Sequence, residues 1–381
     1  MSDEMILTNA RVVTADQVFH GSVLVRDGRI TDLDDKPSAL PQAVDLEGDY
    51  LMPGLIELHT DNLEKHMTPR PGVDWPSLSA VITHDAQVIA SGITTVLDAI
   101  SIGDINPRGQ RLAKLSPMVD AIEQAEKNGL TRAEHHLHLR CEVVHPETQD
   151  VFERLAANPR LSLVSIMDHS PGQRQFVNLD KYRTYYMGKY SLNAEEMDEL
   201  MHRQIRNAQN NSDRQRKAIA AHCARQNVPL ASHDDATAAH VHESIGLGMA
   251  IAEFPTTAEA ASASHQKGLK VMMGAPNIIR GGSHSGNIAA SHLAKEGVLD
   301  ILSSDYYPSS LLAAAMKLTE SDVGFSLPEA IRTVSKTPAE TVGLCDRGEI
   351  KAGLFADLIQ VRAHHGHPLI HQVWKQGRRV F

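Results

Sequence analysis

The stretch His136-Leu-His-Leu-Arg-Cys-Glu-Val143 alternates polar and apolar residues along its whole length. Side chains two positions apart on a β-strand share a face, so the four polar residues lie on one side and the apolar ones on the other. Burying an ionisable face costs free energy unless function uses it. The pattern is typical of a barrel strand whose apolar face packs against helices and whose polar face lines an interior site.

Similar short apolar runs recur on both sides of this stretch, from Gly54 to about Leu344, and longer segments with helical spacing separate them. This is the βαβα pattern of a parallel sheet or barrel. The expected strands are 55–61, 93–99, 136–143, 163–169, 229–233, 249–253, 270–274 and 301–305. Eight is the number that a closed (β/α)8 barrel needs. An open doubly wound sheet is the alternative, but no Gly-rich dinucleotide-binding turn follows the first strand.

The two ends of the chain have the patterning of antiparallel strands. Residues 1–53 alternate short apolar runs with turns, including the hairpin signal Asp27-Gly28, and residues 345–381 continue in the same style. We expect both ends to pair into one small β-sandwich domain beside a barrel domain of residues 54–344. A length of 381 residues fits this division, because a barrel takes about 250 residues.

Composition narrows the class of protein. A hydrophobic content of 42% predicts a globular chain with a large core. A net charge of −10 without a long Lys/Arg stripe argues against a nucleic-acid partner. The start lacks a leader pattern, no apolar run is long enough for a membrane span, and the 3 cysteines form no CxxC pair. We therefore expect a cytoplasmic protein without a membrane partner, and we leave a homo-oligomer open.

Candidate metal ligands fall at or near the ends of the expected strands. They are His59, Asp61, Glu142, His169, His233 and Asp305. Barrel enzymes carry their chemistry at the carboxyl ends of the strands. A single polar residue there is as often a cap or a satisfied buried group, but recurrence at five strands favours a metal site. Glu253 also ends its strand, and ligand and ligand-supporting roles carry equal weight for it.

Imidazole and carboxylate ligands without a thiolate suit Zn²⁺ or Mn²⁺, with one or two ions per chain and a carboxylate such as Glu142 as a bridge. A bound ion lowers the pKa of its water to about 7, which would provide a hydroxide nucleophile at neutral pH. Asp305 would act as a ligand or as the catalytic base for that water.

Cations for an anionic substrate are expected around the barrel mouth. The Gly-rich segment 274–287 follows the seventh strand, where barrels often bind phosphate through backbone N–H groups, and Arg280 and His284 would add charge. A flexible loop without function is the alternative. Further candidates are Lys65, His66, Arg70, Arg140 and Arg174. Each of these could equally be a solvated surface residue.

One long polar stretch, from Gln173 to about Lys217, does not fit the repeat. It holds four of the 7 tyrosines, at positions 182, 185, 186 and 190. It follows the fourth strand, so it should lie over the active face. A lid or substrate-contact role is favoured, and an oligomer contact or a plain surface excursion are the alternatives.

Several segments resemble the amidohydrolase superfamily over nearly the whole chain. They are Ile6-Leu-Thr-Asn-Ala-Arg-Val-Val13, Leu51-Met-Pro-Gly-Leu-Ile-Glu-Leu-His-Thr-Asp61, Thr337-Pro-Ala-Glu-Thr-Val-Gly-Leu344, Gly348 and Gly353-Leu-Phe-Ala-Asp357. The resemblance implies a metal-dependent hydrolase on a (β/α)8 barrel. By position it implies ligand roles for His59, Asp61, His233 and Asp305, and it matches Glu142 with the strand-three glutamate of acetylglucosamine-phosphate deacetylase members.

Two positions depart from the superfamily pattern. Asp61 stands where the first strand usually has a second histidine, and Glu253 stands where the sixth strand usually has one. The second metal site, and the part of His169 in it, therefore stay open.

Four shorter motifs resemble the branch of the superfamily that serves phosphonate utilisation. They are His59-Thr-Asp-Asn-Leu-Glu-Lys-His66, His138-Leu-Arg-Cys-Glu142, Met167-Asp-His-Ser-Pro-Gly172 and Ser303-Ser-Asp-Tyr-Tyr-Pro308. This resemblance implies hydrolysis of α-D-ribose 1-methylphosphonate 5-triphosphate to the 5-phosphate and pyrophosphate, a step of the carbon-phosphorus lyase pathway, by attack of metal-bound hydroxide. The alternatives are a hydrolase of a cyclic amide or N-acyl C–N bond and a non-catalytic interaction protein, which would have no need of the inward ligands.

Overall fold

The computed structural model describes residues 4–106, 109, 111–283 and 286–381. Its larger part is a parallel sheet of eight strands that pair in chain order. They are β6 (Leu55–Thr60), β7 (Ile93–Ile102), β8 (Glu134–Glu142), β9 (Leu161–Met167), β10 (Leu230–His233), β11 (Ile251–Glu253), β12 (Lys270–Gly274) and β13 (Ile301–Ser303). Each overlaps one expected strand, so the predicted (β/α)8 architecture is confirmed.

The first and last barrel strands meet through a few backbone contacts. A parallel bridge joins Thr60 to Asp305, and the Asp305 amide donates to the carbonyl of His59 at 3.1 Å. The buried Glu57 carboxylate accepts from the amides of His59 and Ser304, each at 2.6 Å. Burial raises the pKa of Glu57 to about 7. These contacts close the barrel next to the ends of two site-bearing strands.

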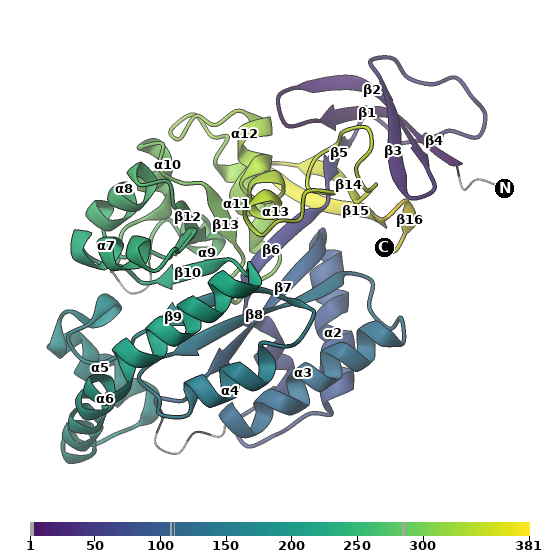
Figure 1. Ribbon diagram of the computed structural model, residues 1–381. Helices are drawn as coiled ribbons and strands as arrows, with labels where there is room; N and C mark the ends of the chain where they lie inside the picture. Colours follow the sequence, from purple (N-terminus) through teal and green to yellow (C-terminus); the bar gives the residue numbers. More distant parts are fainter. Residues whose placement is uncertain (1–3, 107–108, 110, 284–285) are drawn as a thin grey trace.

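Helices surround the strands, as Figure 1 shows. They are α1 (Asn62–Met67), α2 (Ser77–Ala90), α3 (Arg111–Lys127), α4 (Thr148–Leu155), α5 (Leu179–Tyr190), α6 (Ala194–Gln226), α7 (Ala238–Gly246), α8 (Ala258–Gln266), α9 (Ala275–Arg280), α10 (Ala290–Lys295), α11 (Ser310–Lys317), α12 (Leu327–Arg332) and α13 (Lys336–Thr341). The main core contains Leu137, Leu139 and Cys141 of β8 with apolar residues of these helices. The alternation predicted for 136–143 is therefore confirmed.

The amino-terminal half of the barrel interior is apolar. Every strand except β8 contributes to one buried cluster, which includes Leu97, Leu163 and Ile301. Ala339 of α13 and the following Val342 join the same cluster, so this segment closes the barrel from that end. The polar site is consequently confined to the carboxyl ends of the strands.

The residues of β6 do not divide into an inward polar face and an outward apolar face as those of β8 do. Ile56 and Leu58 belong to the interior cluster, and the polar Glu57 and His59 are buried as well. The pairing of β6 with β7 shifts register between Leu55 and Ile56 and again between Glu57 and Thr60. Such irregularities break the two-residue period of a strand, so the inward and outward faces no longer follow from counting.

Both chain ends pair into one second sheet, so the predicted pairing of the two ends is confirmed. Its strands are β1 (Glu4–Val13), β2 (Val18–Arg26), β3 (Arg29–Asp34), β4 (Val44–Asp45), β5 (Tyr50–Pro53), β14 (Leu358–His364), β15 (His367–Lys375) and β16 (Arg378–Arg379). Strand β14 pairs antiparallel with β5, which joins the two ends, while β1 runs parallel to β4 and β5. The expected Asp27-Gly28 turn links β2 to β3, with φ of 49° and 78°.

The long polar stretch after β9 forms a helical excursion. A 3-10 turn, η1 (Arg174–Phe176), leads into α5, which ends at Tyr190 and is followed by Ser191 in the left-handed region at φ 53°. Asn193 and Glu196 then form a capping box that starts α6. Tyr182 and Tyr186 pack with Phe176 in a separate buried cluster, which fixes α5 in place. Among the described residues, no helix is both long and apolar enough to cross a membrane.

A buried ionic cluster joins α2 to β7 and β8. Asp98 accepts from His84 at 2.8 Å and from His135 at 2.7 Å, and Asp85 lies 3.4 Å from the other nitrogen of His135. Burial alone would lower the pKa of His135, but the two carboxylates outweigh it and raise the pKa to about 10. The imidazolium in turn holds the pKa of Asp98 well below its usual range, against the effect of burial.

Asp98→Asn is expected to destabilise the fold by about 3–5 kcal/mol, because it leaves a buried cation without its partner. Denaturant unfolding monitored by circular dichroism would measure the loss. Asp98 has a depressed pKa, so its contribution is present above the unfolded-state pKa near 4 and is lost as the pH falls below it. The matched control is Asp213→Asn, because Asp213 pairs with Lys217 in solvent. An Asp98 variant as stable as this control would contradict the assignment.

Candidate active site

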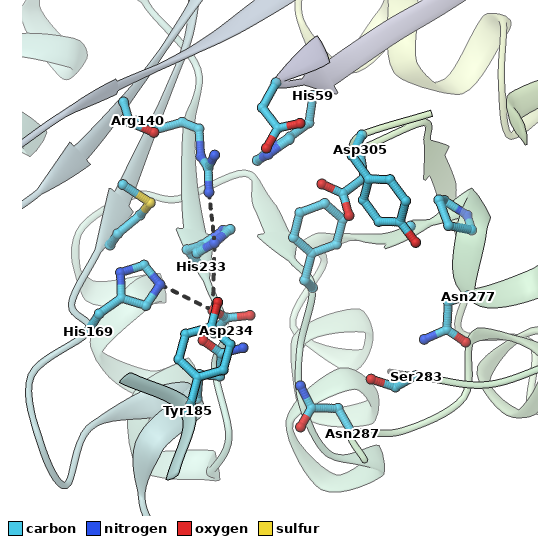
Figure 2. Close-up of a pocket in the computed structure, with 18 of the residues that line it drawn as sticks. His59, Arg140, His169, Tyr185, His233, Asp234, Asn277, Ser283, Asn287 and Asp305 are labelled. Atoms are coloured by element: carbon cyan, nitrogen blue, oxygen red, sulfur yellow. Dashed lines mark hydrogen bonds and ion pairs between the residues drawn. The ribbon is translucent and has the colours of Figure 1, made fainter. Parts of the chain in front are cut away.

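A cavity of about 420 Å³ opens at the carboxyl ends of the barrel strands. Residues from the strand ends form its floor, and Figure 2 shows His59, His233 and Asp305 turned towards one another there. The α5 segment forms one wall, and α9 with the Gly-rich segment after it forms another. Of the candidate ligands, the lining includes His59, Asp61, Glu142, His169, His233 and Asp305.

The fully buried Glu253 carboxylate orients two histidines of the floor. Nδ1 of His59 donates to one carboxylate oxygen at 2.6 Å, and Nδ1 of His233 donates to the other at 2.7 Å. The two rings are nearly parallel, with 4° between their planes. Burial would raise the pKa of Glu253, but the histidines hold it well below the usual value. This arrangement is the carboxylate–histidine support of metal sites, with Nε2 left for the ion.

A third histidine, His138, lies against this pair but does not line the cavity. Nδ1 of His138 bonds to the Leu58 carbonyl at 2.9 Å, and its Nε2 bonds to Ser165. Burial lowers the pKa of His138 to about 3, so the ring is neutral. His59, His138 and Glu253 have donor atoms close enough for an ion. Because these donors already satisfy one another and their neighbours, we assign His138 and Glu253 to support of the site.

Glu253→Gln is expected to weaken metal binding by about 10- to 100-fold, since second-layer partners of ligating histidines have effects of this size. An amide can accept from only one of the two imidazole N–H groups, which releases the other ring. Metal content after dialysis against graded chelator would measure the change. Glu259→Gln on α8 is a matched control outside the cavity lining. Equal metal retention in both variants would contradict the assignment.

A second group of donors lies beside the first. Glu142 accepts from Nδ1 of His169 at 2.5 Å and from its amide at 3.3 Å, so both carboxylate oxygens face the same histidine. Nε2 of His169 and Nε2 of His233 each lie 3.6 Å from one oxygen of Asp234. His169, His233 and Asp234 could together hold an ion. The geometry favours an orienting role for Glu142 over the bridging role that the sequence suggested.

Asp61 and Asp305 complete the floor on the side of the first and last strands. The Oδ1 atom of Asp61 is buried and has no hydrogen-bond partner among the described residues. Burial raises the pKa of Asp305 above its usual value; His59 opposes this effect and the nearby charge of Asp61 adds to it. Two neighbouring carboxylates, one of them with an orphaned oxygen, form a donor set that a divalent cation fits.

Left-handed residues follow three of the site-bearing strands. Asp234, Phe254 and Asp305 have φ of 59°, 54° and 55°. Their amides bond to Glu253, Met272 and His59 on the adjacent strand, which holds the backbone in this conformation. Each such residue costs about 1–3 kcal/mol, and such strain gathers at functional sites. Two of the three side chains are carboxylates of the site.

The candidate cations occupy different positions. Arg140 lines the floor, with Nη2 3.4 Å from Nε2 of His233 and a buried Nε that has no partner among the described residues. Arg280 lines the wall beyond β12. Lys65 is exposed, bonds to the Tyr306 carbonyl and lies outside the lining. His284 lies outside the described residues.

Three other candidates lie away from the lining. Arg174 is buried in an ion network with Asp235 and Glu243, so its charge is compensated inside the protein. His66 bonds to Gln87 at 3.0 Å. Arg70 is exposed and joins the bridge to Val73. The suggested substrate role of Arg174 is therefore a misinterpretation, because its position after the fourth strand did not reveal its carboxylate partners.

Sequence reasoning missed several lining residues. Asp234 follows the strand-ending His233 directly, and this adjacency was an available signal. Asn277, Ser283 and Asn287 lie on the wall opposite Tyr185 in Figure 2. Arg111 reaches the cavity from α3, and nothing in the sequence tied it to the strand ends. Lys189 reaches it from the stretch that was expected over the active face, although the sequence did not single out this residue.

The model of the amidohydrolase family matches residues 50–380, and the chain belongs to this family. The resemblance predicted from the sequence is thereby confirmed. Over 378 residues the chain is 54% identical to the alpha-D-ribose 1-methylphosphonate 5-triphosphate diphosphatase of Escherichia coli (strain K12), which covers 99% of this chain and 100% of that protein.

More distant matches share parts of the sequence or the fold. The D-hydantoinase of Ralstonia pickettii is 27% identical over 164 residues, 42% of this chain and 32% of that protein. The crystal structure of N-acetylglucosamine-6-phosphate deacetylase from Thermotoga maritima superposes with a TM-score of 0.59 at 14% identity, covering 99% of each chain. The latter likeness supports the fold.

Proposed function

We propose that this protein is a metal-dependent diphosphatase that hydrolyses α-D-ribose 1-methylphosphonate 5-triphosphate to the 5-phosphate and pyrophosphate. The observation that carries the proposal is the 54% identity to the Escherichia coli enzyme of that name over its whole length. A cavity lined by imidazoles, carboxylates and arginines supports it, because the substrate is a polyanion. Since a sugar triphosphate does not cross membranes unaided, we place the reaction in the cytoplasm.

The donors form two adjacent groups that suit one or two divalent ions. His59, Asp61, His233 and Asp305, which line the cavity together, would hold the first. His169, Asp234 and His233 would hold the second, since their donor atoms lie close enough to share an ion. Imidazole and carboxylate donors without a thiolate favour Zn²⁺ or Mn²⁺. When bound, such an ion polarises phosphoryl oxygens and makes water acidic enough to lose a proton near neutral pH.

The residues of the chain supply binding, charge and proton transfer. A water oxygen would bond to the α-phosphorus while the bond to the bridging oxygen breaks, so pyrophosphate leaves with the electron pair. Asp305 would take the proton of the attacking water, because its carboxylate lines the cavity floor beside Asp61 and His59. Arg140 would stabilise charge on the α-phosphoryl oxygens, and Arg280 would hold the departing phosphates.

The product assay tests the proposal. Purified protein with Mn²⁺ or Zn²⁺ should release pyrophosphate, and no orthophosphate, from the ribosyl methylphosphonate triphosphate. In ¹⁸O-labelled water the label should enter the sugar 5-phosphate, because attack at the α-phosphorus leaves the pyrophosphate oxygens unlabelled. Hydantoin and N-acetylglucosamine 6-phosphate serve as C–N substrates. Turnover of these, without pyrophosphate release, would replace the diphosphatase with a C–N hydrolase.

A further inference from the structure

The wall of the cavity formed by α5 carries a cation for which the proposed chemistry has no role. Lys189 lines the cavity and is exposed. Its Nζ lies 3.3 Å from the Tyr185 hydroxyl, and it lies 5.2 Å and 5.6 Å from the ring centroids of Tyr185 and Tyr190. Within the described ranges, Lys189 forms no ion pair with a carboxylate. An uncompensated cation in a cavity of an acidic protein attracts an anionic group.

Tyrosines form the rest of this wall. Tyr186 packs edge to face on Tyr185 at 5.0 Å and stacks on Tyr190 at 5.5 Å, and all three line the cavity. Tyr186 is buried against Phe176, so the wall is held by a small core of its own. Arg111 also reaches this wall, but Glu64 pairs with it at 3.3 Å. Flat faces that carry hydroxyl groups suit a sugar ring.

The opposite wall has a different chemistry. Figure 2 shows Asn277, Ser283 and Asn287 across the cavity from Tyr185. His59 and Asp305, on the cavity floor between the two walls, are in the upper part of the view. Arg280 lines this second wall and forms no ion pair with any carboxylate in the described part of the chain. Gly282 lines this wall with no described atom within 4 Å of where a Cβ would stand, which leaves room for close approach of a phosphate to the backbone. Among the described residues, each of the two walls therefore carries a cation without a carboxylate partner, Lys189 on one and Arg280 on the other.

We propose that the α5 wall binds the ribosyl 1-phosphonate half of the substrate, with Lys189 facing the phosphonate, while the Arg280 wall holds the pyrophosphate half. This assignment rests on the proposed function. Cleavage requires the α-phosphorus at the donor groups, so the two halves extend to opposite walls. The tyrosines face the sugar, and the single charge of the phosphonate ester matches Lys189. The polyphosphate end, with its several oxygens, suits the amides, glycines and Arg280.

Binding of product-sized ligands tests this without turnover. Calorimetry would compare α-D-ribose 1-methylphosphonate 5-phosphate, D-ribose 5-phosphate and pyrophosphate on the metal-loaded protein and on Lys189→Met, Arg280→Met and Arg183→Met. Losing one contact between charged groups weakens binding about tenfold or more. Lys189→Met should show this loss for the methylphosphonate ligand and leave D-ribose 5-phosphate unchanged. Arg280→Met should show it for pyrophosphate, and Arg183→Met, whose side chain pairs with Asp198, should bind like the wild type.

Three outcomes overturn the assignment. One is an equal effect of Lys189→Met on both sugar ligands, the second is no effect on either, and the third is weaker pyrophosphate binding in that variant, which would reverse the orientation. Circular dichroism checks that each variant is folded. The proposed function is tested separately, by release of pyrophosphate from the triphosphate by the wild type. The orientation is tested by the ratio of the affinities for the methylphosphonate ligand and for D-ribose 5-phosphate in each protein.

Discussion

Asp305→Asn is expected to lower kcat by about 10²- to 10⁴-fold, the usual contribution of a positioned base. The amide keeps the size of the side chain, and it removes the proton acceptor beside Asp61 and His59. Because the other donors remain, the variant should keep most of its metal. Steady-state pyrophosphate release and metal analysis of the same preparation would measure both quantities.

The control is Asp322→Asn, since Asp322 lies on the surface and pairs with Lys295 at 3.2 Å. It should have wild-type kcat. If Asp305→Asn turned over within a few-fold of this control, the role of base would be refuted. If the metal were lost together with activity, Asp305 would be primarily a ligand.

His233→Ala is expected to have the second large effect, because His233 lies within reach of the same ion as His169 and Asp234 and is also proposed to hold the first ion with the other residues of the cavity floor. Removing a shared ligand should weaken metal binding by more than the 10- to 100-fold expected for loss of a supporting residue. Activity should fall in parallel, on the order of 10³-fold or more, since the ion supplies the polarisation of the phosphoryl group. Metal content by mass spectrometry and initial rates at saturating metal would test this.

The matched control is His242→Ala. His242 is an exposed histidine on α7, the helix that follows β10 and His233. It should retain both metal and activity. Full metal retention in His233→Ala would remove His233 from the ligand set and leave His59, Asp61 and Asp305 to hold an ion without it.

The fold followed from the sequence because short apolar runs at regular intervals report barrel strands directly. The run Ile301–Ser303 and the alternation of β8 were both readable in this way. The faces of β6 were not, because register shifts have no signature in the residue pattern. Counting by two works only while the pairing is regular.

Strand ends predicted which residues gather at the cavity, because parallel strands bring their carboxyl ends to one edge. The sequence did not show which carboxylates stand behind histidines. Glu253 and Glu142 could each have been ligands, and only their contacts to Nδ1 of His59, His233 and His169 distinguish support from coordination. The stretch that holds Lys189 was expected over the active face, but which of its side chains reach the cavity depends on how α5 folds back over the barrel rather than on the strand repeat.

The most direct test of the account is metal reconstitution of the purified protein. The protein would be stripped with chelator, checked for residual metal, and assayed for pyrophosphate release from α-D-ribose 1-methylphosphonate 5-triphosphate before and after addition of Mn²⁺ or Zn²⁺. We predict that release disappears on stripping and returns in proportion to the bound ion, up to one or two ions per chain. Full release by protein shown to be free of metal would contradict the central claim.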